Sequence, residues 1–212
     1  MKMRSPLLIA AVATFGLGTF VARAEAKKAA TPAATPAAAS NGFQTDFLGL
    51  LDDVQKKIMS LEDAIPQDKF KWRPAPGVRS VSEAFLHIAY GNYGFTKGAT
   101  GKAPAADVGW GPDHAKWDTK TTDKAEIKKT LEASFEQVRA AMKDVTDADL
   151  DKKVNVFGHD LTERAVWMAL LGHLNEHMGQ EVAYARANGV VPPWSMPKGA
   201  TGANGANGAN GG

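Results

Sequence analysis

The sequence contains no cysteine among its 212 residues. This absence excludes disulfide bonds, a cysteine-rich zinc finger, a c-type haem attachment motif and a cysteine nucleophile. It also excludes a lipid anchor attached through a cysteine. Any chemistry that the protein carries out must therefore use other side chains.

The sequence also has little net charge, because its 25 Lys and Arg residues are nearly matched by 23 Asp and Glu residues. Three of the cations, Lys2, Arg4 and Arg23, lie in the first 24 residues, which contain no acid. Without that segment the net charge falls from +2 to −1. Nucleic-acid binding depends mainly on the neutralisation of phosphate charge. We therefore expect no nucleic-acid partner.

The N-terminal apolar run is too short for a membrane-spanning helix. It extends from Leu7 to Val21, whereas about 20 residues are needed to cross a bilayer. Basic residues before the run and the small residues Ala22 and Ala24 after it are typical of a secretory signal peptide over residues 1–24. We expect an exported protein, periplasmic or secreted, with no stable membrane span after signal cleavage. An uncleaved N-terminal anchor is the alternative.

Composition divides the rest of the chain into three parts. Residues 25–41 consist mostly of Ala, Thr and Pro, which cannot bury an apolar face, so we expect an extended linker. Residues 198–212 repeat a Gly-Ala-Asn triplet, which predicts a disordered tail. Residues 42–197 lie between them and are numerous enough for one hydrophobic core.

Helical periodicity dominates residues 42–197. Apolar residues recur at three- and four-residue steps in four segments, at about residues 43–65, 80–95, 123–143 and 160–188. Ser80 and Glu83 form a capping box at the start of the second helix, and Gly189 is a natural end for the last one. The pattern predicts an all-α protein built as a four-helix bundle.

Two other segments show no strong pattern of helix or strand. Residues 98–121 are too rich in glycine for a helix, which predicts a long crossover between the second and third helices. Residues 153–157 alternate weakly between polar and apolar side chains, as a strand would. No other segment offers a pairing partner, so we expect no sheet.

Three of the five histidines are placed as metal ligands would be. His173 and His177 are four residues apart, so their rings leave the same helix face one turn apart. His87 lies in the second helix at a core-facing phase. Two histidines from one helix and one from another give the open three-nitrogen arrangement of catalytic zinc sites, although partly buried histidines also occur without a metal. His114 and His159 fall in expected loops, and we leave them outside the site.

Neighbouring polar residues are candidates for supporting roles. Glu83 lies one turn before His87 and could orient its second ring nitrogen, although capping alone also explains this residue. Gln180 and Tyr184 continue the face of His177. They could contact a substrate or a water on the metal, or they could pack within the bundle.

Two motifs resemble those of the DinB-like family. The first is the run from Trp72 to Val81, followed by Glu83 and His87, which is similar to the family's stretch leading into the second helix. The second is the run from His173 to Gln180, followed by Tyr184, Arg186, Pro192 and Pro193, which is similar to the end of the family's domain. The resemblance implies an up-down-down-up bundle whose metal ligands are His87, His173 and His177.

The resemblance also implies a range of activities. Related proteins include thiol-dependent S-transferases and a mycothiol-dependent isomerase, in which a metal activates a substrate thiolate. We hypothesise a divalent ion, zinc or nickel, or else iron or manganese, in a metal-dependent hydrolase or thiol-transferase-like enzyme for an unidentified small molecule. The alternative is a non-catalytic bundle that binds a small ligand or is associated with stress. A homodimer is compatible with such a bundle, although the sequence indicates no interface.

Overall fold

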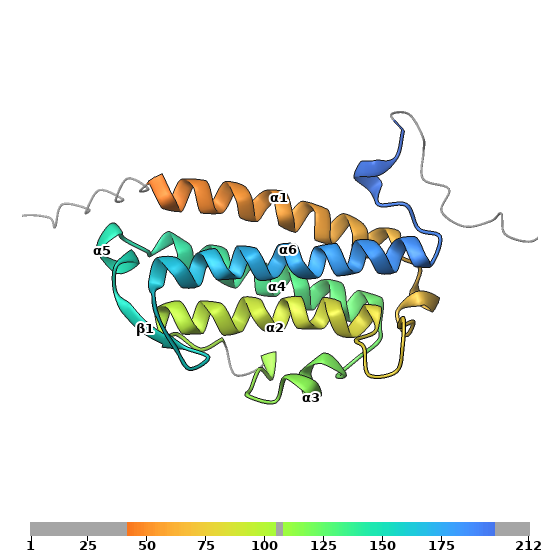
Figure 1. The fold of residues 1–212 in the computed structure, drawn as a ribbon, viewed down its shortest axis with the longest axis horizontal. Coiled ribbons are helices and arrows are strands. Elements are labelled where there is room, and N and C mark those ends of the chain that lie inside the picture. The colour runs from red at the N-terminus through yellow and green to blue at the C-terminus, as the bar shows by residue number, and fades with distance from the viewer. Residues whose placement is uncertain (1–41, 105–107, 198–212) are drawn as a thin grey trace, which may run out of the picture. The chain divides into compact units, whose positions relative to one another are not determined.

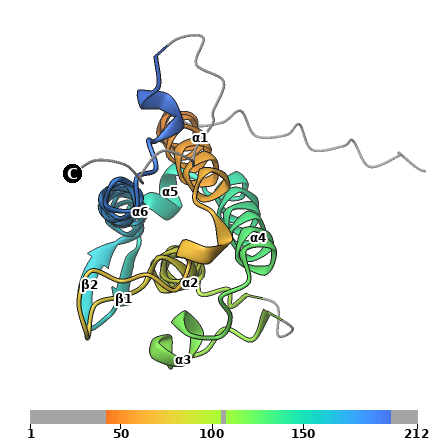
Figure 2. The same ribbon diagram turned by 90° about the vertical axis from the view of Figure 1, so that its right-hand side faces the viewer.

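The computed structural model describes residues 42–104 and 108–197; the expected signal peptide, linker and tail lie outside these residues. Four long helices form most of the described chain: α1 (Gly42–Ala64), α2 (Val81–Thr100), α4 (Lys124–Lys143) and α6 (Glu163–Ala187) (Figure 1). Seen end-on, α2 and α1 lie opposite each other, and each packs against both α4 and α6 (Figure 2). The four helices enclose one apolar core, which confirms the predicted all-α bundle.

Contacts between helix ends give the direction of each helix. Gln44, in the first turn of α1, donates a hydrogen bond of 2.7 Å to a main-chain carbonyl near the end of α4, so these two helices are antiparallel. Phe47 packs edge-on against Trp167, and both lie in the early turns of α1 and α6, so these two are parallel. His87, early in α2, lies against His177, late in α6. The helices therefore run up, down, down and up, consistent with the expected topology.

Side-chain caps fix where the long helices begin. The Ser80 hydroxyl accepts the main-chain N–H of Glu83, and the Glu83 carboxylate accepts the N–H of Ser80, which confirms the capping box. The side chains of Asp123 and Thr162 each accept one main-chain N–H and so cap α4 and α6. Each such cap contributes about 1 kcal/mol to stability. Gly189, with φ of +75°, follows the end of α6.

Helix α2 continues to Thr100, past its expected end near Phe95, so the assignment of residues 98–100 to a loop was wrong. Glycine disfavours a helix by about 1 kcal/mol relative to alanine, which is why Gly98 suggested a loop. In this helix, packing against a neighbouring segment outweighs the unfavourable helix propensity of glycine. A Cβ atom at Gly98 would lie 2.9 Å from both γ carbons of Val156, so the glycine allows another segment to approach α2 closely.

The crossover between α2 and α4 contains a short helix, α3 (His114–Asp118), where we expected no regular structure. The Asp113 side chain caps α3 by accepting a main-chain N–H of its first turn. Trp117 is buried and donates its Nε1–H to the carbonyl of Leu86 on α2 at 2.9 Å. This contact anchors α3 beside α2, although five residues are too few for periodicity to reveal a helix.

A β-hairpin precedes α6, so the expectation of no sheet was wrong. Strand β1 (Lys153–Val156) pairs antiparallel with β2 (His159–Thr162). The partner strand comes from residues that we assigned to the start of the last helix, which instead begins at Glu163. Phe157 and Gly158 form the turn with φ of +53° and +83°. Two-residue hairpins favour positive φ at both positions, but a Phe-Gly pair is not a usual signal for one.

Three short helical segments complete the described chain: η1 (Gln67–Lys69), α5 (Asp147–Leu150) and η3 (Pro193–Ser195). Trp72, in the loop after η1, packs edge-on against Tyr184 of α6 at a ring distance of 5.4 Å. Within residues 42–104 and 108–197, no helix combines the length and hydropathy needed to cross a bilayer.

Candidate metal centre

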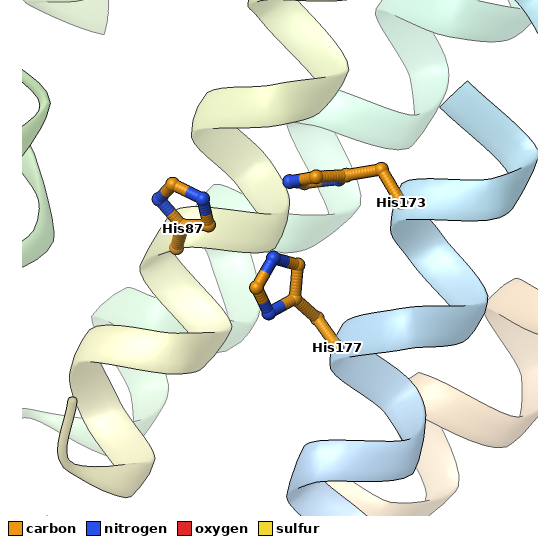
Figure 3. Close-up of side chains that lie close together, drawn as sticks. All are labelled: His87, His173 and His177. Carbon is orange, nitrogen blue, oxygen red and sulfur yellow. The ribbon is translucent and has the colours of Figure 1, made fainter. Parts of the chain in front are cut away.

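The antiparallel packing of α2 against α6 brings three histidine side chains together. His87 projects from α2, and His173 and His177 project from α6 into the same space between the two helices (Figure 3). Ring centroids are 4.5 Å apart for His173 and His177, 4.8 Å for His87 and His177, and 5.3 Å for His87 and His173. One ring nitrogen from each residue lies within 4.8 Å of the other two. The three residues could therefore hold one metal ion.

A glycine on α2 makes room for the ring of His173. A Cβ atom at Gly91 would lie 2.2 Å from Cε1 of His173 and 2.7 Å from its Nδ1. Real Cβ atoms do not come this close to another heavy atom, so the imidazole lies directly on the helix backbone. Gly91 was not among the predicted site residues. A glycine inside a helical pattern, one turn after His87, was the signal that could have found it.

The environment keeps the histidines on α6 neutral. Burial, together with the neighbouring His177 and His87, lowers the pKa of His173 from 6.5 to about 3. The pKa of His177 is also lowered, mainly by burial. Metal binding requires the neutral imidazole, so no bound proton has to be displaced near neutral pH.

One of these ring nitrogens also lacks a partner. Nδ1 of His173 is buried and has no hydrogen bond within the described part of the chain. A buried polar atom without a partner costs about 1–3 kcal/mol, which makes it unusual in a purely structural role. Three imidazole rings, one of which carries an unsatisfied nitrogen, are a donor set that suits a divalent transition metal.

His87 takes its supporting contact from Asp118, the last residue of α3. Nδ1 of His87 lies 3.2 Å from Oδ2 of this buried carboxylate, which also accepts a 2.8 Å hydrogen bond from Nε of Arg79. A carboxylate at the second ring nitrogen fixes the orientation of a ligating histidine and leaves Nε2 for the metal. Glu83 was a candidate for this role, with helix capping as the alternative. Its carboxylate closes the capping box of α2 and pairs with Arg73 at 2.6 Å. Asp118 was missed because its short helix was missed.

His177 takes its supporting contact from its own helix. Its Nδ1 lies 2.9 Å from Oε1 of Gln180, and the Gln180 amide donates a 2.7 Å hydrogen bond to the hydroxyl of Tyr184. An amide oxygen can only accept a hydrogen bond, so Nδ1 of His177 carries the proton. Nε2 of His177 is then left for a metal. Gln180 and Tyr184 thus lie next to the cluster, while a contact of either residue with a substrate stays a prediction.

A cavity of about 520 Å³ lies beside these supporting residues. Its lining includes Asp118 and Gln180, which contact two of the three histidines, together with Arg79, Glu83 and His114. His114 is exposed, as expected, but it begins α3 rather than lying in a loop, and its ring centroid is 6.3 Å from that of His87. His159 is exposed on β2. Neither belongs to the three-histidine cluster.

These features define a class of protein, a four-helix bundle with a candidate three-histidine metal centre between two helices. Residues 50–180 match the DinB superfamily, and the chain therefore belongs to that family. This match confirms the resemblance seen in the sequence.

Solved structures of the same family share the fold. A DinB-like protein from Bacillus cereus is 20% identical, with a TM-score of 0.58 over 70% of this chain and 95% of that one. A DinB-like protein from Bacillus subtilis is also 20% identical, with a TM-score of 0.54 over 74% and 96% of the two chains. At this identity the likeness concerns the fold alone. No curated protein matches the chain.

The contact between Asp118 and His87 predicts the effect of a conservative change. Asp118→Asn is expected to weaken metal affinity by about 10- to 100-fold, because an amide orients the imidazole less firmly than a carboxylate does. The matched control is Glu83→Gln, which alters a carboxylate of the same cavity that does not contact His87. Competition with a chromophoric zinc chelator measures both affinities. A larger loss for Glu83→Gln than for Asp118→Asn would show that the supporting group is misassigned.

The lowered pKa of His173 predicts how the metal-free protein responds to acid. Between pH 6.5 and about 3 the unfolded chain binds a proton at this histidine and the folded chain does not. The free energy of unfolding therefore falls as the pH drops through this range, by up to about 1.4 kcal/mol per pH unit for this group.

Urea unfolding at pH 7 and at about pH 5 measures this loss, and His173→Gln should lose about 2 kcal/mol less than the wild type between the two. His159→Gln, which changes an exposed histidine, should behave as the wild type does. An equal loss in His173→Gln and the wild type would contradict the assigned pKa.

Proposed function

We propose that this protein is an exported metal-dependent enzyme of the hydrolase or thiol-transferase type, with one divalent ion held by His87, His173 and His177. The observation that carries the proposal is the convergence of the three rings, one of which carries a buried, unpartnered nitrogen. Export is supported by the signal-like composition of residues 1–24.

The residues around the cluster prepare it for a metal. Asp118 and Gln180 engage Nδ1 of two rings and so direct Nε2 of each toward the shared space. Gly91 lets the third ring lie against α2, and burial lowers the pKa of His173 and of His177, which favours their neutral forms. When bound to three neutral imidazoles, a divalent ion keeps coordination positions open and acts as a Lewis acid toward a water, a thiol or a carbonyl group.

The nitrogen donors favour zinc or nickel over the hard cations magnesium and calcium, and iron or manganese also bind such sites. The cavity of about 520 Å³ beside Asp118 and Gln180 is large enough for a small-molecule substrate.

A second candidate function is a binding bundle without catalysis. It is favoured by the ion pairs that the carboxylates of the cavity already form. Glu83 and Asp118 line the cavity, but Glu83 pairs with Arg73, and Asp118 pairs with Arg79 and His87. Neither carboxylate is therefore free to act as a general base on a substrate. In that case the cavity would hold a small ligand, and a metal would be structural or absent.

Metal removal distinguishes the two functions. For a catalytic-type site, a chelator should remove the ion while the far-ultraviolet circular dichroism of the bundle stays unchanged, because the fold does not depend on the metal. The cobalt-loaded protein should also change its visible absorption when azide is added, since an open position accepts the anion. Unfolding on metal loss, or a cobalt spectrum that azide does not alter, would contradict the catalytic assignment and favour a structural ion.

A further inference from the structure

A second, larger hollow lies along α2 on the side of the β-hairpin. This groove, with a volume of about 1020 Å³, is bounded by Tyr90, Gly94 and Gly98 of α2, by Trp110 of the crossover, and by Val156 and Phe157 of the hairpin. It is distinct from the cavity of about 520 Å³, which is lined by other residues. The proposed function makes no use of it so far.

Gly94 of α2 lies buried at the bottom of the groove, beneath two aromatic rings. A Cβ atom at Gly94 would lie 3.7 Å from Cζ of Phe157 and 3.7 Å from Cζ2 of Trp110, but the glycine provides none. Phe157 leaves 68% of its surface exposed and has a φ of +53°, a conformation that costs a bulky residue about 1–3 kcal/mol. A large exposed apolar ring held at such a cost is a feature expected of a ligand contact.

Four lysines line the groove together with the three acids Asp144, Asp149 and Glu163, so its formal charge is +1. Lys97 and Lys153 line it and form no ion pair with any described residue, whereas Lys102 and Lys152 pair with acidic residues of the same lining. The Lys97 ammonium lies 5.1 Å from the ring centroid of Trp110, so a cation and an aromatic face are presented together. Two unpaired cations beside aromatic rings complement a flat apolar molecule that carries an anionic group.

The groove also adjoins the histidine cluster. Tyr90 lines the groove, and its ring stacks with that of His87 at a centroid distance of 6.2 Å. Phe95 contacts Phe157 at 5.3 Å on one side and His173 at 5.4 Å on the other. The same aromatic layer therefore borders both the groove and two of the proposed ligands.

We propose that this groove binds an amphipathic anion, a small molecule with a flat apolar body and one carboxylate or sulfonate group. The apolar body lies against Trp110 and Phe157, and the anionic group lies beside Lys97 and Lys153. None of the three histidines lines the groove, so this binding does not require a metal.

The test uses 8-anilinonaphthalene-1-sulfonate, a fluorescent amphipathic anion, with the purified metal-free protein at neutral pH and low salt. The wild type should bind one dye molecule saturably. Phe157→Ala removes one wall at an exposed position and should weaken binding about tenfold, and Gly94→Leu, which fills the bottom of the groove, should weaken it at least as much. Near-ultraviolet circular dichroism confirms that each variant is folded.

Charge is tested with a matched pair of dyes. The double variant Lys97→Gln, Lys153→Gln should lose about tenfold in affinity for the sulfonate dye and should bind N-phenyl-1-naphthylamine, which has the same aromatic body without the sulfonate, as the wild type does. Binding of the sulfonate dye that is equal in the wild type and all folded variants would overturn the groove assignment.

Dye binding tests the groove proposal, and metal content tests the proposed metal-dependent enzyme, so either proposal can fail without the other. Normal metal content without dye binding would overturn the groove alone. Dye binding without metal content would leave the groove standing and remove the metal-dependent enzyme.

Discussion

Replacement of His173 by alanine is expected to abolish metal binding and leave the bundle folded. The metal content should fall from about one ion per chain to near zero, because two imidazoles alone do not form a tight site for these ions. The fold should persist because Nδ1 of His173 makes no hydrogen bond to any described residue, so its loss strands no partner. Elemental analysis gives the metal content, and thermal unfolding of the metal-free protein should shift by no more than about 5 °C.

The controls for this variant are the two histidines outside the cluster. His159→Ala changes an exposed residue on β2, and His114→Ala changes an exposed residue that lies near His87 without joining the cluster. Both should keep the full metal content. If His173→Ala also kept it, the three-histidine assignment would be wrong, and loss of metal in His114→Ala would mean that the site includes α3.

Replacement of Gly91 by alanine is expected to have the second largest effect, although it changes no candidate ligand. The new methyl group would lie 2.2 Å from Cε1 of His173, so the ring or the helix must move. Overpacking of this kind costs about 1–3 kcal/mol, which outweighs the gain of about 1 kcal/mol in helix propensity. A displaced ring should also lower metal affinity by roughly 100-fold, which chelator competition measures.

Gly94→Ala is the matched control on the same helix. Its methyl group would meet Phe157 and Trp110 at 3.7 Å, an ordinary contact distance, so no ligand has to move. We expect unchanged metal affinity and equal or greater stability in this variant. Equal metal affinities for the two alanine variants would show that the close contact between Gly91 and His173 does not position the ring.

The bundle could be predicted because its signals repeat over many residues. Apolar residues at three- and four-residue steps mark α1, and the capping box of Ser80 and Glu83 marks the start of α2. The hairpin and α3 gave no such signal. Elements of four or five residues are too short to show a repeating pattern of apolar residues. The hairpin turn also places Phe157 in a conformation that its side chain does not favour.

The candidate site was likewise predictable only in part. The i, i+4 spacing of His173 and His177 and the helical phase of His87 were enough to predict which rings converge. Asp118 could not be placed, because it reaches His87 only through the docking of α3 by Trp117. A contact between segments 31 residues apart depends on tertiary packing and leaves no local pattern.

The most direct test of the central claim is the metal content of the wild-type protein. The protein should be purified without an affinity tag, reconstituted in turn with zinc, nickel, iron or manganese, desalted, and analysed by elemental mass spectrometry. The three converging imidazoles predict about one tightly held ion per chain with at least one of these metals. No retained metal under any of these conditions would contradict the account and leave His87, His173 and His177 as partly buried core histidines.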